Sequence, residues 1–319
     1  MEEAARDYEF PLNKYFDLEE NRLLTPRDGI SFDQWIAGAT EARFAIHKDG
    51  FPVFLPASTL LESDEYTETD PYAVVDNQAK WPAFYRRRLN STIDLVEESL
   101  KEAGAKPRIL DVACGEGHIT AEIVRKFPEA EVSGTDYSIS AICTATKSFH
   151  GIDFSVADAH RLPYQDEYFD VVVCNNIWEH VPDPLRLLES VRRVLVPGGC
   201  AIISTPSRYR FRNMVRVCLG KPVALLSHMH VTEYTVGQVL EQLRFAGMEA
   251  KLVDEPLRGP ASGVLRFVAF KVAVPLVRLG LRLIGSHHSP EETVFYLARK
   301  PMPEGRSTPP SERQEPIVL

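Results

Sequence analysis

The sequence is short of the features that mark several classes of protein. Its five cysteines are an odd number in 319 residues and form no C-x-x-C pair. This excludes a disulfide-rich secreted scaffold and predicts a reducing, cytoplasmic environment. No run of about 18 uncharged apolar residues occurs, so we expect no transmembrane segment. The acidic residues Met1–Asp7 also lack the basic and apolar regions of a signal peptide.

An excess of basic residues is missing as well. The net charge is −9 at pH 7, so we expect no nucleic-acid partner. The charge is unevenly spread, because residues 1–70 hold 16 acidic and 6 basic side chains, whereas residues 201–300 hold 7 acidic and 14 basic ones. Such asymmetry indicates either a basic site for an anionic substrate or two halves that face each other.

Strand and helix patterns alternate through most of the chain. The strands are predicted at Arg108–Ala113, Glu131–Thr135, Asp153–Val156, Phe169–Cys174, Cys200–Ser204, Glu249–Val253 and Thr293–Ala298. The helices between them include Ile119–Lys126, Leu185–Leu195 and Val236–Ala246. Alternation of this kind predicts a parallel sheet that is covered by helices on both faces.

The alternating region has flanking segments of different composition. Residues 1–70 form an acidic extension in which Ala45–Leu55 reads as a small β-hairpin with Asp49-Gly50 at its turn. Residues 301–319 are rich in Pro, Ser, Glu and Arg, which predicts a disordered tail.

Two insertions interrupt the alternation. The first, residues 206–231, carries Arg208, Arg210, Arg212 and Arg216, which would clamp a phosphate or carboxylate of a substrate, face solvent, or pair with the acidic extension. The second, residues 256–290, contains the apolar and basic segment 264–284. This segment is consistent with a lid over a pocket, a dimer contact, or a helix that lies on a membrane surface.

The stretch Ile109–Thr120 reads as a strand, a glycine turn and the start of a helix. Gly115 and Gly117 lack a Cβ, so a ligand can approach their backbone closely. The helix beyond them presents unpaired N–H groups and a positive dipole end to that ligand. A turn of this type alone is shared by many nucleotide-binding folds.

Polar residues follow the next three strands as well. Asp136 lies nineteen residues after Gly117, Asp158 follows the third strand, and Asn175 follows the fourth. Ligands of open α/β sheets bind at the carboxyl ends of the strands, so we expect these residues to converge. Asp136 is placed to accept hydrogen bonds from ribose hydroxyls, or else to cap the helix near Ser138. Asp158 is alternatively a turn residue.

Five motifs in order carry a resemblance to a known family: Leu110–Gly117, Asp136, Asp158–Pro163, Glu179–Pro184 and Val194–Gly199. Together they resemble class I S-adenosylmethionine-dependent methyltransferases. The resemblance implies a Rossmann-like, seven-stranded α/β fold over residues 71–300, mostly parallel with an antiparallel last strand. The N-terminal extension and the insertions after strands five and six are additions to this fold. Ala113 stands where the family often has a glycine.

The resemblance implies a binding site for S-adenosylmethionine. Its residues would be Asp111, Ala113, Gly115, Gly117, Asp136, Tyr137, Asp158, Ala159 and Asn175. The first four would hold the methionine portion, Asp136 the ribose, and Tyr137 the adenine face. Asp158 and the Ala159 N–H would meet the adenine edge, and the Asn175 backbone would lie near the methionyl amine.

The implied activity is methyl transfer to a small-molecule acceptor by in-line displacement without a metal. We expect the acceptor atom to be a hydroxyl oxygen, which requires a proton acceptor. His180 and His230 are the candidate bases, although either is also consistent with a structural role.

Other functions are consistent with parts of the same pattern. Methylation of RNA, protein or a lipid-like acceptor shares the same cofactor site. An NAD(P)-dependent oxidoreductase shares the glycine-to-aspartate spacing, but Thr120 replaces the third glycine of its G-x-G-x-x-G motif. A non-catalytic partner subunit with the same fold is a further alternative.

The N-terminal extension resembles the small β module of the Trm112 family. Zinc ligands of that module are not expected here, because Thr25 stands where its first cysteine would be. The sequence leaves the oligomeric state open.

Overall fold

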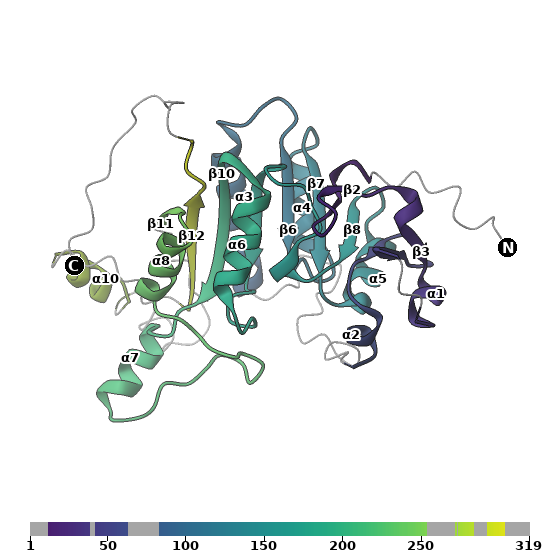
Figure 1. Ribbon diagram of the computed structural model, residues 1–319. Helices are drawn as coiled ribbons and strands as arrows, with labels where there is room; N and C mark the ends of the chain where they lie inside the picture. Colours follow the sequence, from purple (N-terminus) through teal and green to yellow (C-terminus); the bar gives the residue numbers. More distant parts are fainter. Residues whose placement is uncertain are drawn as a thin grey trace.

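A ten-stranded mixed sheet forms the centre of the protein (Figure 1). The computed structural model describes residues 12–38, 42–62, 83–253, 272, 274–283 and 292–303. In spatial order the strands are β11 (Glu249–Leu252), β12 (Thr293–Arg299), β10 (Leu195–Pro206), β9 (Phe169–Asn175), β6 (Arg108–Val112), β7 (Glu131–Asp136), β8 (Asp153–Val156), β5 (Pro52–Val53), β4 (Phe44–Ile46) and β3 (Gly29–Ser31). A separate pair consists of β1 (Phe16–Asp17) and β2 (Arg22–Leu23).

The predicted fold class is confirmed. Each of the seven expected strands is present within two residues of its predicted limits, except that β10 extends to twelve residues, from Leu195 to Pro206. Strands β6 to β10 pair in parallel, and β12 runs antiparallel to both β10 and β11. The sheet has three more strands than predicted, because β3, β4 and β5 of the N-terminal extension join it.

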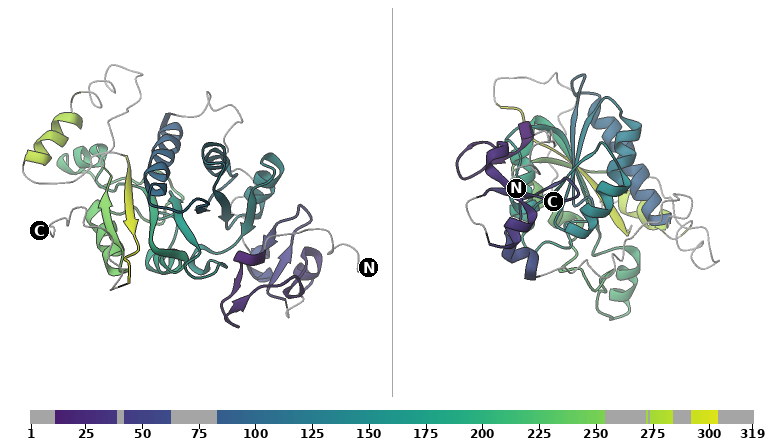
Figure 2. Two further views of the ribbon diagram at one scale, coloured as in Figure 1. Left: turned by 90° about the horizontal axis from the view of Figure 1, so that it is seen from above. Right: turned by 90° about the vertical axis from the view of Figure 1, so that its right-hand side faces the viewer.

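Helices cover both faces of the sheet, as the alternation predicted (Figures 1 and 2). On one face α6 (Pro184–Val194) and α8 (Val236–Phe245) bury their apolar residues, and on the other α3 (Ala83–Leu100) and α4 (His118–Lys126) do so. Helix α5 (Ile139–Ser148) packs beside β7 and β8. The central strand β9 is therefore buried along almost all of its length, which explains its run of valines.

Shorter helices lie in the flanking regions and loops. They are η1 (Leu12–Lys14), η2 (Pro26–Asp28), α1 (Phe32–Ile36), α2 (Ala57–Glu62), η4 (Ala159–Arg161), α7 (Phe211–Cys218) and α10 (Val274–Leu283). In Figure 1, α7 extends away from the lower end of the sheet.

The N-terminal extension contains the predicted hairpin. Strands β4 and β5 pair antiparallel, and Gly50 adopts a left-handed φ of 90° at the turn. Val53 of β5 pairs in parallel with Val156 of β8, so the hairpin continues the main sheet. Lys14, which is fully buried, also ties the extension to the sheet by donating hydrogen bonds to Ser133 (2.8 Å) and Asp153 (2.6 Å).

Several predictions fall outside the described residues. These include the domain boundary near residue 70, most of the 256–290 insertion and the tail beyond residue 303. Of the apolar and basic segment 264–284, the structure describes residue 272 and helix α10. Among the helices that the structure describes, none combines the length and the apolar character needed to cross a membrane.

Candidate functional site

A cavity of about 660 Å³ lies at the carboxyl ends of β6, β7, β8 and β9. Strand β6 has β7 on one side and β9 on the other, so the cavity occupies the point where the strand order reverses. The predicted residues that line it are Asp111, Ala113, Gly115, Asp136, Tyr137, Asp158, Ala159, Asn175 and His180. Gly117 and His230 are not among the residues that line it.

The glycine turn after β6 forms one wall. Gly115 has a left-handed φ of 55°, and a Cβ built on it would point into open space, which leaves its backbone exposed to the cavity. A Cβ on Gly117 would instead lie 2.7 Å from the Phe154 ring, so the absence of a Cβ there allows the turn to pack closely against this ring. Ala113 also has a positive φ, 58°, a conformation that glycine adopts more readily than other residues.

Asp136 is fixed by the turn that it faces. Its carboxylate accepts hydrogen bonds from the N–H of Gly115 (2.8 Å) and the N–H of Ser138 (2.9 Å). Helix α5 is capped by the Ser138 side chain, which accepts from the Ala141 N–H. The interpretation of Asp136 as the cap of this helix was therefore wrong.

Asp111 is a buried carboxylic acid at the end of β6. Only 2% of the residue is exposed, and its Oδ2 accepts a hydrogen bond from the Thr120 hydroxyl (2.7 Å). Burial raises the pKa of Asp111 to about 7, and the nearby Asp136 carboxylate adds to this, whereas Thr120 and Arg88 act in the opposite direction. Any cation that binds beside Asp111 will favour its ionised form.

The remaining predicted positions combine structural contacts with a place on the cavity wall. Asp158 begins the η4 turn and accepts hydrogen bonds from the His160 N–H (2.9 Å) and ring (2.8 Å), so the turn interpretation also holds. The Asn175 side-chain amide is bound to Thr92 and Ser204, and Asn175 is among the residues that line the cavity.

Helix α3 supplies two cavity residues that the sequence reasoning missed, Tyr85 and Arg88. The Arg88 guanidinium lies 4.7 Å from the centre of the Tyr85 ring, and its Nε has no hydrogen-bond partner among the described residues. A signal was present, because Arg88 follows Tyr85 by three positions and precedes Thr92 by four. A helix places such residues on one face, and Tyr85 and Thr92 are both buried.

The charge of the cavity indicates what it binds. Four carboxyl groups line it, on Asp111, Glu116, Asp136 and Asp158, against the single guanidinium of Arg88. The pyrophosphate of a dinucleotide would be repelled by this set of groups, whereas a ligand with cationic groups and hydroxyls would be attracted.

The two candidate bases are adjacent but not equivalent. The rings of His180 and His230 are 5.0 Å apart at 90° to each other, and of the two only His180 lines the cavity. Burial and the neighbouring His230 lower the pKa of His180 to about 4, so its ring is neutral at pH 7. His230 is 8% exposed, and its Nδ1 lies 2.9 Å from the Glu233 carboxylate.

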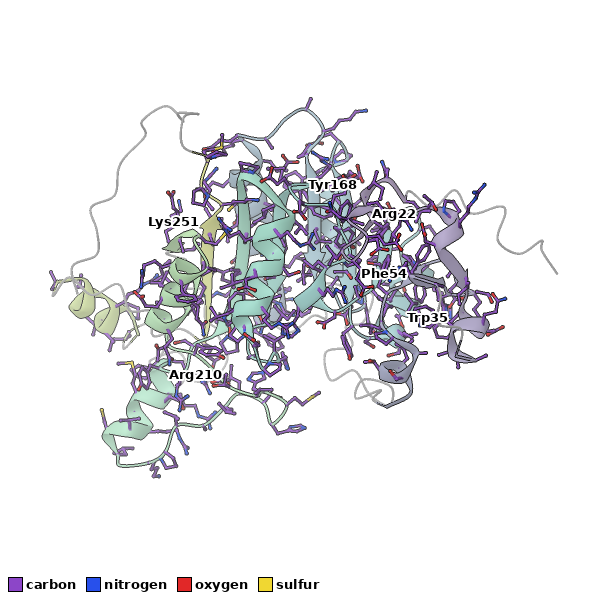
Figure 3. All side chains as sticks on the ribbon, in the orientation of Figure 1. Arg22, Trp35, Phe54, Tyr168, Arg210 and Lys251 are labelled. Atoms are coloured by element: carbon purple, nitrogen blue, oxygen red, sulfur yellow. The ribbon has the colours of Figure 1, made fainter. Side chains whose placement is uncertain are left out.

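The arginines of the first insertion do not form a common anion site. Arg210 lies at the start of α7 (Figure 3) and is buried. It donates hydrogen bonds to the Glu233 carboxylate and to the Ala224 carbonyl. Arg216 donates to the Pro222 carbonyl (2.8 Å), and Arg212 is exposed. Arg210 thus organises the insertion itself, and the clamp interpretation was wrong for this residue.

Comparisons with known proteins define the class. Residues 104–243 match a family model described as a methyltransferase domain. The chain is 40% identical over 180 residues to the ubiquinone/menaquinone biosynthesis C-methyltransferase UbiE of Desulfotalea psychrophila, covering 55% of this chain and 73% of that protein. It is 32% identical over 153 residues to a ubiquinone biosynthesis O-methyltransferase of Xanthomonas oryzae pv. oryzae, covering 44% of this chain and 62% of that protein. The YcgJ protein of Bacillus subtilis aligns with a TM-score of 0.47 and 17% identity, over 68% of this chain and 100% of that one.

The chain belongs to the S-adenosylmethionine-dependent methyltransferases, with the class I fold. Its cofactor is S-adenosylmethionine, which carries a sulfonium, an ammonium and two ribose hydroxyls. The cavity fits this molecule, because its carboxyl groups suit the cationic and hydroxyl groups and the open backbone at Gly115 admits a close approach.

Asp111 provides a first test of how the cofactor is held. The bound ammonium would lower the pKa of Asp111 from about 7, so binding at pH 6 should release close to one proton and binding at pH 8.5 almost none. Calorimetry at each pH, in buffers of different ionisation enthalpy, measures this number. Asp111→Asn should remove the release at pH 6; equal release in the wild type and the variant would rule out Asp111 as its source.

Proposed function

We propose that this methyltransferase acts on a small-molecule acceptor and methylates a hydroxyl oxygen. The observation that carries the proposal is the composition of one end of the cavity. In the loop after β9, the residues that line the cavity are Asn176, Ile177, His180, Val181 and Pro182. Apolar side chains beside one neutral imidazole suit a compact, mostly apolar molecule that bears a polar group.

The described residues divide the cavity into two functional ends. We assign the end at Asp111, Gly115, Asp136 and Asp158 to the cofactor, in the roles that the family resemblance implies. Arg88 would meet the carboxylate of the methionine portion, because it is the only basic side chain other than histidine in the described lining. The end at His180 is left for the acceptor.

The bound cofactor supplies an electrophilic methyl group, and the protein contributes mainly position. Holding the acceptor oxygen in line with the methyl group removes several kcal/mol from the barrier by proximity and orientation. The neutral His180 ring offers a lone pair at the cavity wall, where it can receive the acceptor O–H. A group with a pKa of about 4 is a weak base, so a nearby positive charge would assist the loss of this proton.

A ring carbon is the second candidate for the methylated atom. It is favoured by the name of the relative at 40% identity, which is a C-methyltransferase. The two candidates share the same first step, because an ionised phenol is nucleophilic at its oxygen and at the neighbouring ring carbon.

The product identifies the acceptor atom. The protein would be incubated with a panel of phenols, catechols and hydroxy acids and with cofactor that carries a ¹³C-labelled methyl group. Two-dimensional NMR then distinguishes a methyl bound to oxygen from one bound to carbon. We expect an O-methyl product; a C-methyl product would move the reaction to the second candidate, and methylation of RNA or protein alone would overturn the small-molecule proposal.

Replacing His180 tests the assignment of the acceptor end. His180→Ala should lower kcat by about 10²- to 10⁴-fold, which is the usual contribution of a positioned proton acceptor. Its affinity for the cofactor should stay close to that of the wild type. His150→Ala is the matched control, because His150 is exposed after α5 and outside the cavity lining. Equal activity of the two variants would remove His180 from the reaction.

A further inference from the structure

Two more side chains with metal-binding groups lie beside His180, behind the acceptor end of the cavity. They are Glu179, which precedes His180 in the loop after β9, and His230, from the end of the first insertion. Each of the three residues offers one atom that can bind a metal ion, and these three atoms all lie within 4.8 Å of one another. Two segments fifty residues apart therefore bring two imidazoles and one carboxylate to a single point.

The Glu179 carboxylate is only half satisfied. The residue is fully buried, and its Oε2 accepts a hydrogen bond from the Thr205 hydroxyl (3.0 Å). Its Oε1 is also buried and has no hydrogen-bond partner among the described residues. A buried carboxylate oxygen in this state is costly unless a cation or a donor completes its environment. Arg210, which belongs to the same insertion as His230, is bound to Glu233 instead.

His230 is oriented as a metal ligand would be. Its Nδ1 is paired with Glu233 Oε1 (2.9 Å), and Glu233 is itself held by the Leu226 N–H (2.5 Å) and by Arg210. This arrangement fixes the orientation of the ring and leaves Nε2 as the ring nitrogen that can bind a metal ion. A carboxylate that binds the far nitrogen of a histidine is the usual support of a metal-binding imidazole in proteins.

We propose that Glu179, His180 and His230 bind a divalent transition-metal cation, and that the acceptor hydroxyl of the proposed reaction completes its coordination. Two histidines and one carboxylate form a metal site that leaves coordination positions open. His180 is the one of the three that lines the cavity, so the open positions face the acceptor end. The part concerning the acceptor rests on the proposed function, and the proposal replaces the expectation from the sequence that no metal takes part.

The metal would supply a positive charge at the acceptor end of the cavity. With the metal bound, His180 would act as a ligand and no longer as the proton acceptor, because its lone pair would be shared with the cation. An oxygen bound to a divalent cation loses its proton more readily, and the proton would then pass to bulk water. The oxygen then attacks the methyl carbon, a C–O bond forms, and the C–S bond breaks with its electron pair remaining on sulfur. The products are a methyl ether and the neutral thioether of the cofactor, so charge and atoms balance.

Metal binding can be measured without an assay of activity. Full-length protein would be freed of metals with a chelator and titrated with Mn²⁺, and the spin-resonance signal of free Mn²⁺ would report binding. We expect about one Mn²⁺ per chain in the wild type. Glu179→Gln and His230→Gln should weaken binding by about 100-fold or more, since loss of a mere supporting residue costs 10- to 100-fold. His228→Gln, an exposed histidine two residues from His230, should bind like the wild type.

Cofactor calorimetry on each variant verifies that the fold is intact. If either variant fails to fold, His180→Asn takes its place with the same expectation. Absence of Mn²⁺ binding to the wild type, or equal binding by the variants, would overturn the metal site. If the protein binds metal but a chelator does not change the methylation rate, the contact between the metal and the acceptor is overturned. The proposed function would still stand in that case. Metal binding without methylation of any small molecule would instead count against the proposed function.

Discussion

Asp136→Ala is expected to weaken the binding of S-adenosylmethionine by about 10²- to 10⁴-fold. We propose that the Asp136 carboxylate accepts hydrogen bonds from the two ribose hydroxyls, and each bond to a charged group contributes roughly 1.5–3 kcal/mol. The Gly115 and Ser138 N–H groups hold this carboxylate on the cavity wall, so its orientation is set before the cofactor binds. Calorimetric titration with the cofactor or its demethylated product measures the effect.

Two further variants define the cause of that loss. Asp136→Asn keeps the size of the side chain and removes its charge, so its affinity should lie between those of the wild type and of Asp136→Ala. Glu129→Ala, on the exposed turn before β7, should bind as the wild type does. If Asp136→Ala binds the cofactor with unchanged affinity, the carboxylate serves only to fix the glycine turn.

Arg210→Ala is expected to lower the free energy of unfolding by about 3–5 kcal/mol. The Arg210 guanidinium is 2% exposed and the Glu233 side chain 0%, so removal of one partner leaves a buried charge without compensation. The Ala224 carbonyl loses its donor from Arg210 as well. Denaturant titration measures the change, and hydrogen exchange should locate it in the insertion between β10 and α8.

The exposed Arg212 provides the matched control, and Arg212→Ala should change stability by less than about 0.5 kcal/mol.

The pH dependence of stability gives an independent measure of the Arg210–Glu233 pair. Although burial opposes it, the bonds from His230, Leu226 and Arg210 hold the pKa of Glu233 below its ordinary value. Its contribution to stability is therefore complete above the pKa of the unfolded chain and is lost as the pH falls through the lowered value. Equal stability of the two arginine variants would mean that the ion pair contributes nothing net.

The fold could be predicted from the sequence because its signals are local. The β-branched apolar run Val171–Cys174 is typical of a buried strand, and a glycine turn followed by a helix marks the end of β6. The residues after each strand then converge, because parallel strands place their carboxyl ends along one edge. Nine of the predicted site residues accordingly line one cavity.

Other features depend on contacts that no local pattern specifies. The pairing of Val53 with Val156 joins segments about a hundred residues apart, and strand pairing of this kind has no sequence signature. The Arg210–Glu233 pair likewise depends on the path that the insertion takes through space, which the sequence does not show. The basic residues of the insertion were therefore interpreted as a possible binding surface. The half-satisfied carboxylate of Glu179 is visible only when every neighbour of its two oxygens is known.

The position of the N-terminal hairpin has a consequence for the behaviour of the protein in solution. Strand β8 would be the open edge of the sheet if β5 did not pair with it. An open edge offers unpaired N–H and C=O groups to other chains and is a common starting point for aggregation. The acidic extension therefore protects this edge. Through Lys14 it is also bound to Ser133 of β7, the strand that ends at Asp136, and to Asp153 of β8, the strand that precedes Asp158. A shortened protein that begins at α3 should therefore bind cofactor poorly and associate edge to edge.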